Sequence, residues 1–103
     1  MQFLVLGFDG NDSEASERRA AAREAHLELG NELRDAGTML YAVAMLDEKD
    51  EMAGSAVVYN VESREALDAI LEKEPYVNGE VWQRVEVVPC RVPPSFENMK
   101  PSA

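Results

Sequence analysis

Two apolar runs flank a long helix-forming stretch, and this arrangement constrains the fold more than any other feature of the chain. The run QFLVLGF at 2–8 indicates a strand, which ends at the turn-forming segment FDGNDS. Residues 13–36 are rich in Ala, Glu, Arg and Leu, which favours one helix with Asp12 or Ser13 as its N-cap and Gly37 as its stop. The run TMLYAVAML at 38–46 is almost continuously apolar, as is typical of a strand covered on both faces.

The second half of the chain repeats this alternation. A third strand is predicted at 54–60, a helix capped by Ser63 at 64–73, and a fourth strand at 81–88, while the charged run DEKDE at 47–51 indicates a solvated turn. Glu74-Pro75 ends the second helix, because a residue before proline is pushed out of the helical region. The order βαββαβ predicts an α+β, ferredoxin-like fold, a four-stranded antiparallel sheet with two helices on one face. It spans residues 1–92, and the proline-rich residues 93–103 are expected to be an extended or disordered tail.

The composition of the chain limits the classes of partner that it can bind. Twenty acidic residues against ten basic ones give a formal charge of -10, which repels nucleic acid and anionic membrane surfaces. We expect a cytoplasmic protein, because the chain opens with a strand pattern rather than a signal peptide. The single cysteine, Cys90, makes an internal disulfide impossible, and neither a metal nor a cofactor is expected. Helices on one face leave the other face of an apolar sheet uncovered, so we predict a homodimer packed sheet to sheet.

The only histidine, His26, lies on the apolar stripe of the first helix, which also carries Arg19 and has Arg23 beside it. A buried imidazole needs hydrogen-bond partners. Asp35 is nine residues on and points to the opposite side of the helix, whereas Asp9 leaves the first strand where the helix packs back over it. Asp9 is therefore the better candidate. A carboxylate at one ring nitrogen fixes the tautomer and leaves the other nitrogen free to move a proton. From the residues alone, a core histidine bonded to a backbone carbonyl remains the simpler interpretation.

A resemblance changes that balance. The segment FLVLGFDGNDSEASERRAAAREAHLELGNELRDAG and the later EPYVNGEVWQRVEVVPCRV resemble the YciI-like (YCII-related) family of dimeric alpha-beta barrel proteins. The specific elements are Asp9 after the first strand, Arg23 with His26 as R-x-x-H, and Glu74-Pro75-Tyr76 before the last strand. The resemblance implies a dimer with a His-Asp active site at His26 and Asp9. It also implies cofactor-independent chemistry on small cyclic molecules, including chloride elimination in a few relatives.

The sequence departs from the family pattern in three places. Ala42-Val43-Ala44 replaces the usual Ala-Gly-Pro, which predicts a narrower or reshaped pocket, Glu74-Pro75 replaces Asp-Pro, and Cys90 replaces a frequent tryptophan.

Two functions follow as hypotheses. In the first, His26 oriented by Asp9 transfers a proton in an elimination or isomerisation of a small cyclic or carboxylated metabolite, with Arg23 and Tyr76 binding the substrate. In the second, the same pocket belongs to a non-catalytic ligand-binding or regulatory dimer. For Arg19 the residues favour a surface ion pair, and Tyr76 is more simply a packed ring.

Overall fold

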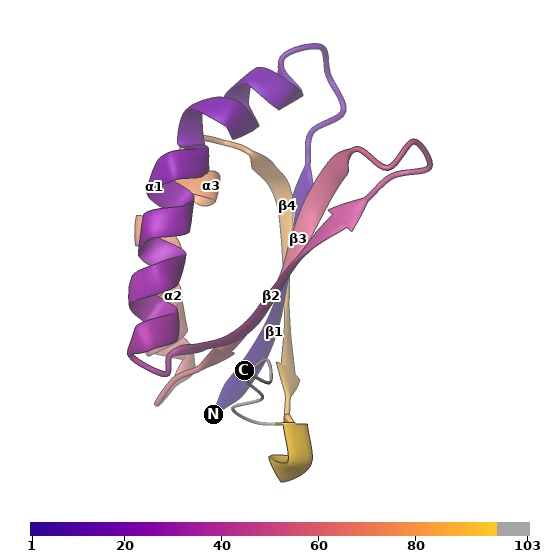
Figure 1. Ribbon diagram of the computed structural model, residues 1–103. Helices are drawn as coiled ribbons and strands as arrows, with labels where there is room; N and C mark the ends of the chain where they lie inside the picture. Colours follow the sequence, from indigo (N-terminus) through magenta and orange to yellow (C-terminus); the bar gives the residue numbers. More distant parts are fainter. Residues whose placement is uncertain (97–103) are drawn as a thin grey trace, which may run out of the picture.

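The computed structural model describes residues 1–96 and contains one four-stranded antiparallel sheet with its helices on one face (Figure 1). The strands are β1 (Gln2–Asp9), β2 (Met39–Leu46), β3 (Met52–Asn60) and β4 (Trp82–Cys90). The order across the sheet is β2-β3-β1-β4, and every neighbouring pair is antiparallel. This confirms the predicted ferredoxin-like fold.

The helices are α1 (Ala15–Asp35), α2 (Arg64–Lys73) and α3 (Pro75–Asn78), and a 3-10 turn, η1, covers Pro94–Phe96. Gly37 follows α1 with φ 77, the left-handed backbone that glycine adopts most readily. Helix α1 begins two residues later than predicted, and Asp12 lies before it, where its carboxylate accepts the N–H of Glu14. No helix among residues 1–96 is long and apolar enough to cross a membrane.

Helix α3 is an element that the sequence did not predict. Pro75 is its first residue, where a missing N–H is harmless, and the Glu74 carboxylate caps it by accepting the N–H of Tyr76 at 3.0 Å. One turn is too short to produce a periodic pattern.

In the predicted tail, residues 94–96 also differ, because they form η1 instead of an extended arm, and residues 97–103 lie outside the described part.

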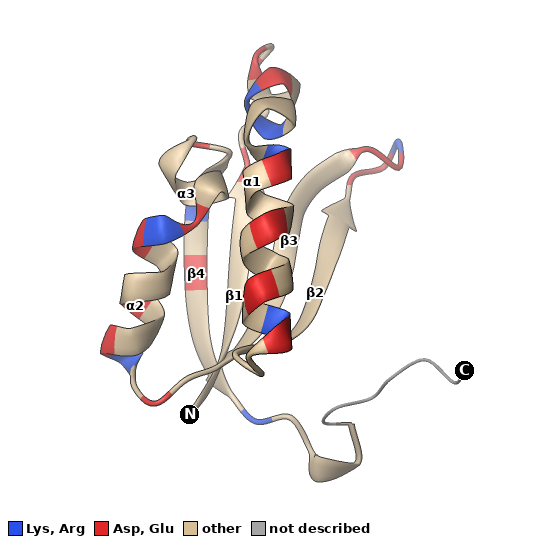
Figure 2. Cartoon of the chain, turned by 60° about the vertical axis from the view of Figure 1, so that its left-hand side comes forward, with Lys and Arg blue, Asp and Glu red and all other residues tan. Residues whose placement is uncertain are grey.

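The core lies between the helices and the sheet in two clusters. The first contains Phe3, Val5, Met39, Val57, Tyr59 and Leu67, and the second contains Tyr76, Val81 and Trp82. Helix α1 adds no fully buried residue to either cluster. Its acidic residues follow its outer face along its length, while its arginines gather mostly in its first half (Figure 2).

The other face of the sheet has no helix over it (Figure 1). Residues directly opposite in antiparallel strands point to the same face, so Leu4 lies beside Val58 and Val88 there, and Ala56 lies beside Leu6 and Val43. Val43 is 61% exposed and Val88 is 45% exposed. The predicted uncovered apolar face is therefore present.

Candidate functional site

The site is built around His26, which projects from the inner face of α1 toward α3. Its Nδ1 lies 2.5 Å from Oε1 of Glu74, whose side chain is completely buried, whereas 17% of the His26 side chain is exposed. When Glu74 is ionised its carboxylate can only accept, so in that state Nδ1 carries the proton of this contact. Nε2 has no hydrogen-bond partner among residues 1–96 and is not among the atoms closed off from solvent. The imidazole is thus held at one nitrogen and open at the other.

Two aromatic rings fix the orientation of this imidazole. The ring of Tyr76 stacks on His26 with centroids 3.7 Å apart and planes within 4°. Trp82 meets both rings edge-on, at 6.1 Å from His26 and 5.8 Å from Tyr76, and donates its Nε1–H to the Ser55 hydroxyl at 3.3 Å. Burial raises the pKa of the Tyr76 phenol, although the charges of Arg19 and Arg23 act in the opposite direction.

Trp82 is placed by a glycine in the neighbouring strand. A Cβ on Gly7 would lie 2.2 Å from the indole ring, so only glycine leaves room for this ring against β1. The identity of residue 7 therefore decides whether the edge-on contacts to His26 can form.

The structure corrects the predicted partner of His26. Asp9 makes no hydrogen bond to the imidazole; its Oδ2 accepts from Nη1 of Arg19 at 2.6 Å. Helix α1 runs back over the sheet from the end of β1, so Arg19, near its start, reaches Asp9. His26 is seven residues further on, about 10 Å along the axis. The alternative partner, a backbone carbonyl, is also replaced, because Glu74 occupies Nδ1.

Arg19, which the sequence favoured as a surface residue, is part of the site. Its side chain is only 14% exposed, it pairs with Asp9, and its guanidinium carbon lies 4.9 Å from the centre of the Tyr76 ring. Arg23 is exposed. The structure thus links Asp9, Arg19, Tyr76, His26 and Glu74 in one continuous series of contacts.

A cleft of about 900 Å³ opens beside this series, between the start of α1 and the β2–β3 hairpin. Asp9, Arg19 and Arg23 line it from one side, and Asp47, Asp50 and Glu51 are among the residues from the hairpin. The Asp47 side chain accepts the N–H groups of Lys49 and Glu51, as in a solvated turn. Among residues 1–96, no group of His, Cys, Asp and Glu is arranged to hold a metal ion.

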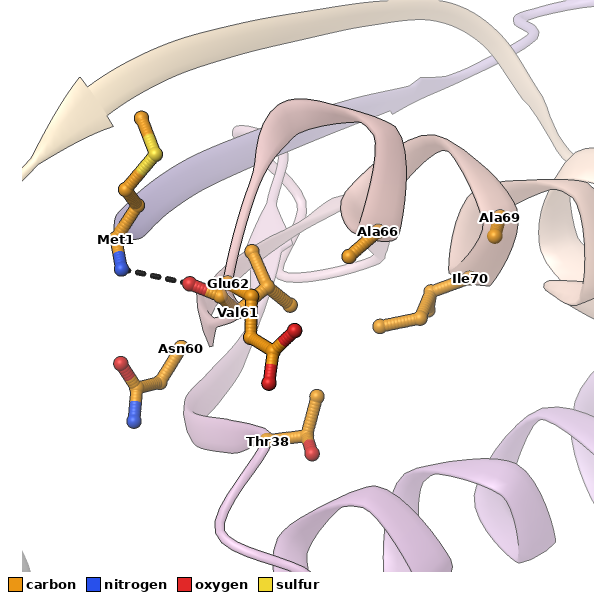
Figure 3. Close-up of a pocket in the computed structure, with 8 residues that line it drawn as sticks. All are labelled: Met1, Thr38, Asn60, Val61, Glu62, Ala66, Ala69 and Ile70. Carbon is orange, nitrogen blue, oxygen red and sulfur yellow. Dashed lines mark hydrogen bonds between the residues drawn. The ribbon is translucent and has the colours of Figure 1, made fainter.

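A second pocket, of about 630 Å³, lies at the opposite end of β1 (Figure 3). Its lining includes Met1, Thr38, Glu62 and Ile70, and the terminal ammonium of Met1 donates to the Val61 carbonyl at 2.6 Å. Glu62 is the only side chain in its lining that carries a charge, so this pocket offers no acid–base pair comparable to His26 and Glu74.

Sequence reasoning missed Glu74 as the partner because it interpreted the residue as the end of α2 and as part of the Glu74-Pro75-Tyr76 element, and assigned neither a contact with His26. The available signal was its position directly before Pro-Tyr, where a carboxylate caps a short turn and remains fixed. Arg19 carried a weaker signal, since it shares a stripe with Arg23 and His26 at spacings of four and three residues.

Comparisons with known proteins agree with this architecture. The model of the YCII-related domain matches residues 1–91. Protein YciI of Escherichia coli O6:H1 and Protein YciI of Shigella flexneri are each 36% identical over 97 residues, which cover 88% of this chain and 97% of theirs. A similar solved structure is 5-chloro-2-hydroxyhydroquinone dehydrochlorinase (TftG) from Burkholderia phenoliruptrix AC1100 in complex with 2,5-dihydroxybenzoquinone. Its TM-score is 0.75 at 22% identity, with 88% of this chain and 94% of that chain covered, a likeness of fold.

Proposed function

This chain belongs to the YCII-related domain family, and from that premise we propose that it is a proton-transfer enzyme that needs no cofactor and acts on a small cyclic or carboxylated metabolite. The observation that supports this most directly is the imidazole of His26, which a buried carboxylate holds at Nδ1 and whose Nε2 has no partner within residues 1–96. A fixed tautomer with one open nitrogen is the arrangement that a general acid or base requires.

In this proposal Nε2 of His26 removes a proton from the substrate. The resulting imidazolium lies against Glu74, whose side chain forms no other ion pair among residues 1–96, so the pair stabilises the charge that develops during the step. In an elimination, the electrons of the broken C–H bond form the new double bond as the leaving group departs. In an isomerisation, the proton returns to a different carbon. Arg23 and Tyr76 are proposed to contact the substrate.

The family relation makes hydroxylated rings the first substrates to try. The similar structure is named a dehydrochlorinase of a hydroxyhydroquinone and holds a dihydroxybenzoquinone. We therefore propose chlorinated hydroquinones and cyclic keto acids as a panel, incubated with the protein in deuterium oxide. NMR then detects the loss of C–H signals, and an electrode detects released chloride.

The control variants separate chemistry from folding. His26→Gln should abolish deuterium exchange, because the amide cannot take up a proton near neutral pH, while Asp35→Asn changes an exposed acid on the same helix and should exchange at the wild-type rate. Exchange that persists in His26→Gln contradicts the proposal. Binding of panel compounds without exchange or chloride release would favour the second hypothesis, a ligand-binding dimer without chemistry.

We also propose that the uncovered sheet face forms the homodimer, cytoplasmic in location. An apolar face of this kind, carrying Val43 and Val88, is unstable in contact with water. Val43→Glu should therefore shift sedimentation toward the monomer, whereas Leu27→Glu, which changes an exposed leucine of α1, should not. A wild-type monomer at micromolar concentration contradicts the proposal.

A further inference from the structure

We infer that Arg19 and Arg23 form an anion-binding subsite beside His26, and that Asp9 limits this subsite to a single net positive charge, so that it selects a monoanionic substrate. The inference deepens the proposed function and rests on it only in naming the substrate class. It also gives Asp9 a different role from the one predicted, because Asp9 here positions Arg19 and sets the charge of the subsite instead of orienting His26.

Arg19 is held in place but keeps free donors. One guanidinium nitrogen, Nη1, donates to Asp9, and the guanidinium also lies over the ring of Tyr76. The other guanidinium nitrogens make no hydrogen bond to a described residue, and none of them is closed off from solvent. A guanidinium fixed in this way offers its remaining N–H groups to an oxyanion in the cleft.

The neighbouring Arg18 shows the contrast. Its Nη1 and Nη2 both donate to the Asp12 carboxylate, at 2.9 and 2.6 Å, and its Nε is buried without a partner. Both terminal nitrogens of Arg18 are thus engaged by one carboxylate, although the residue is adjacent to Arg19 in the sequence. The two adjacent arginines have different environments, and only Arg19 is among the residues that line the cleft.

Arg23 supplies the second cation. It is exposed, lines the same cleft and forms no ion pair within residues 1–96. Residues four apart are neighbours on a helix surface, so Arg19 and Arg23 project side by side. Arg23, which has no ion-pair partner among residues 1–96, and Arg19, which keeps free N–H donors, can together bind a carboxylate or an enolate oxygen.

The helix also sets the size of the substrate. His26 lies three residues beyond Arg23 and seven beyond Arg19, which corresponds to about 4.5 and 10 Å along the axis. The ring of Tyr76 contacts both the Arg19 guanidinium and the imidazole, with its centre 4.9 Å from the first and 3.7 Å from the second, so an anion bound at the two arginines lies close to His26. We therefore infer a short separation between the acidic group and the reacting atom, as in a small ring compound with one acidic group.

Asp9 determines the charge of the subsite. Its side chain is 6% exposed, and its Oδ1 is buried without a hydrogen-bond partner among the described residues. Two guanidinium groups and this carboxylate leave one net positive charge, which a monoanion neutralises. Four further acids line the cleft: Asp12 is paired with Arg18, and Asp47, Asp50 and Glu51 are exposed, so solvent screens them as it screens the exposed Arg23. These acids add to the repulsion of a dianion. A dianion would be repelled by Asp9 at short range.

Binding of small probes tests this without knowledge of the natural substrate. Trp82 is the only tryptophan and contacts Tyr76, so its fluorescence reports occupancy near the subsite. The probes are benzoate, its neutral isostere benzamide, and the dianion phthalate. We expect benzoate to bind about tenfold or more tightly than benzamide, the effect of one charge-assisted hydrogen bond.

The variants isolate each charge. Arg23→Met should remove the preference for benzoate over benzamide, while Arg34→Met, an exposed arginine at the far end of α1, should keep it. Arg19→Met leaves Asp9 without its arginine partner and should weaken the binding of benzoate. The double variant with Asp9→Asn should recover affinity, because the repelling carboxylate is gone. Asp9→Asn alone should increase the affinity for phthalate more than the affinity for benzoate. A merely structural role for Asp9 would not produce this difference.

The outcomes distinguish this inference from the proposed function. Equal binding of benzoate and benzamide, no binding of either up to millimolar concentration, or an unchanged ratio in Arg23→Met overturns the anion subsite even if deuterium exchange occurs. If Asp9→Asn leaves the ratio of phthalate affinity to benzoate affinity unchanged, the role of Asp9 is overturned. If the binding pattern is as expected in both wild type and His26→Gln but no compound exchanges deuterium, the subsite stands and the catalytic proposal fails.

Discussion

The substitution Glu74→Gln separates the two roles that the structure gives to one buried side chain. Glu74 caps α3 through the N–H of Tyr76 and holds Nδ1 of His26, both through Oε1. Glutamine has the same shape, and its carbonyl oxygen can accept both hydrogen bonds. The substitution therefore removes the negative charge while the packing and the cap remain.

The expected effects on stability and on activity differ in size. Loss of charge assistance in the bond to Nδ1 costs about 1 kcal/mol, because charged hydrogen bonds contribute about 1.5–3 kcal/mol and neutral ones about 1 kcal/mol. Removing a buried charge whose Oε2 has no partner among the described residues offsets part of that. We therefore expect unfolding free energy to change by less than about 1 kcal/mol. Proton transfer should slow by about 10²-fold or more, because the imidazolium loses its counter-charge.

Three measurements on the same protein check this prediction. Urea denaturation gives the unfolding free energy, deuterium exchange on an active panel compound gives the rate, and nitrogen NMR of the only histidine gives the tautomer. Glu74→Ala is the comparison, since it also removes the cap and leaves His26 without a partner, and it should cost about 2–4 kcal/mol. If Glu74→Gln exchanges deuterium at the wild-type rate, Glu74 is only a cap, and the acid–base pair is refuted.

Three further perturbations follow from the geometry. Gly7→Ala should destabilise the fold by about 1–3 kcal/mol and alter the emission of Trp82, since a Cβ there enters the indole ring; unchanged emission would contradict the packing. Burial raises the pKa of the Tyr59 phenol, so its contribution is complete below about pH 10 and is lost as pH rises further, when the unfolded chain loses the proton first. Tyr59→Phe should therefore flatten the alkaline loss of stability in urea titrations, without abolishing it because Tyr76 shifts the same way; an unchanged slope would refute this. Glu74→Asp should keep the α3 cap, because aspartate caps well, but withdraw the carboxylate by about 1.5 Å from Nδ1, so its exchange rate should fall clearly below wild type; a wild-type rate would mean that α1 can approach α3.

The fold was predictable from the sequence because its elements differ sharply in hydrophobic period. The long helix after β1 and the apolar runs on either side of it leave few topologies open, and the observed sheet order agrees with the simplest of them. Helix α3 was not predictable in this way, since four residues give no period, and only the Glu-Pro-Tyr sequence indicated a capped turn.

The candidate site was predictable in part. The helical spacing correctly predicted that His26 faces the interior, and it correctly excluded Asp35 as the partner of the imidazole. The partner depended on how far along the sheet α1 packs, which helical periodicity does not contain. A carboxylate distant in sequence, on a turn between α2 and β4, therefore took the place that the nearer Asp9 was expected to fill.

The three departures from the family pattern have unequal weight once the strands are placed. Val43 lies opposite Ala56 in the pairing with β3, on the uncovered face, and it does not line the cleft beside Arg19 and Arg23, so it cannot narrow that cleft as the sequence suggested. Cys90 lies opposite Gln2, at the end of β1 remote from Asp9. Of the three departures, only Glu74 contacts the imidazole. A longer acid at that position lengthens the reach of the carboxylate by one methylene group, so this departure alters the acid–base pair itself, whereas the other two act on the outer face and the far end of the sheet.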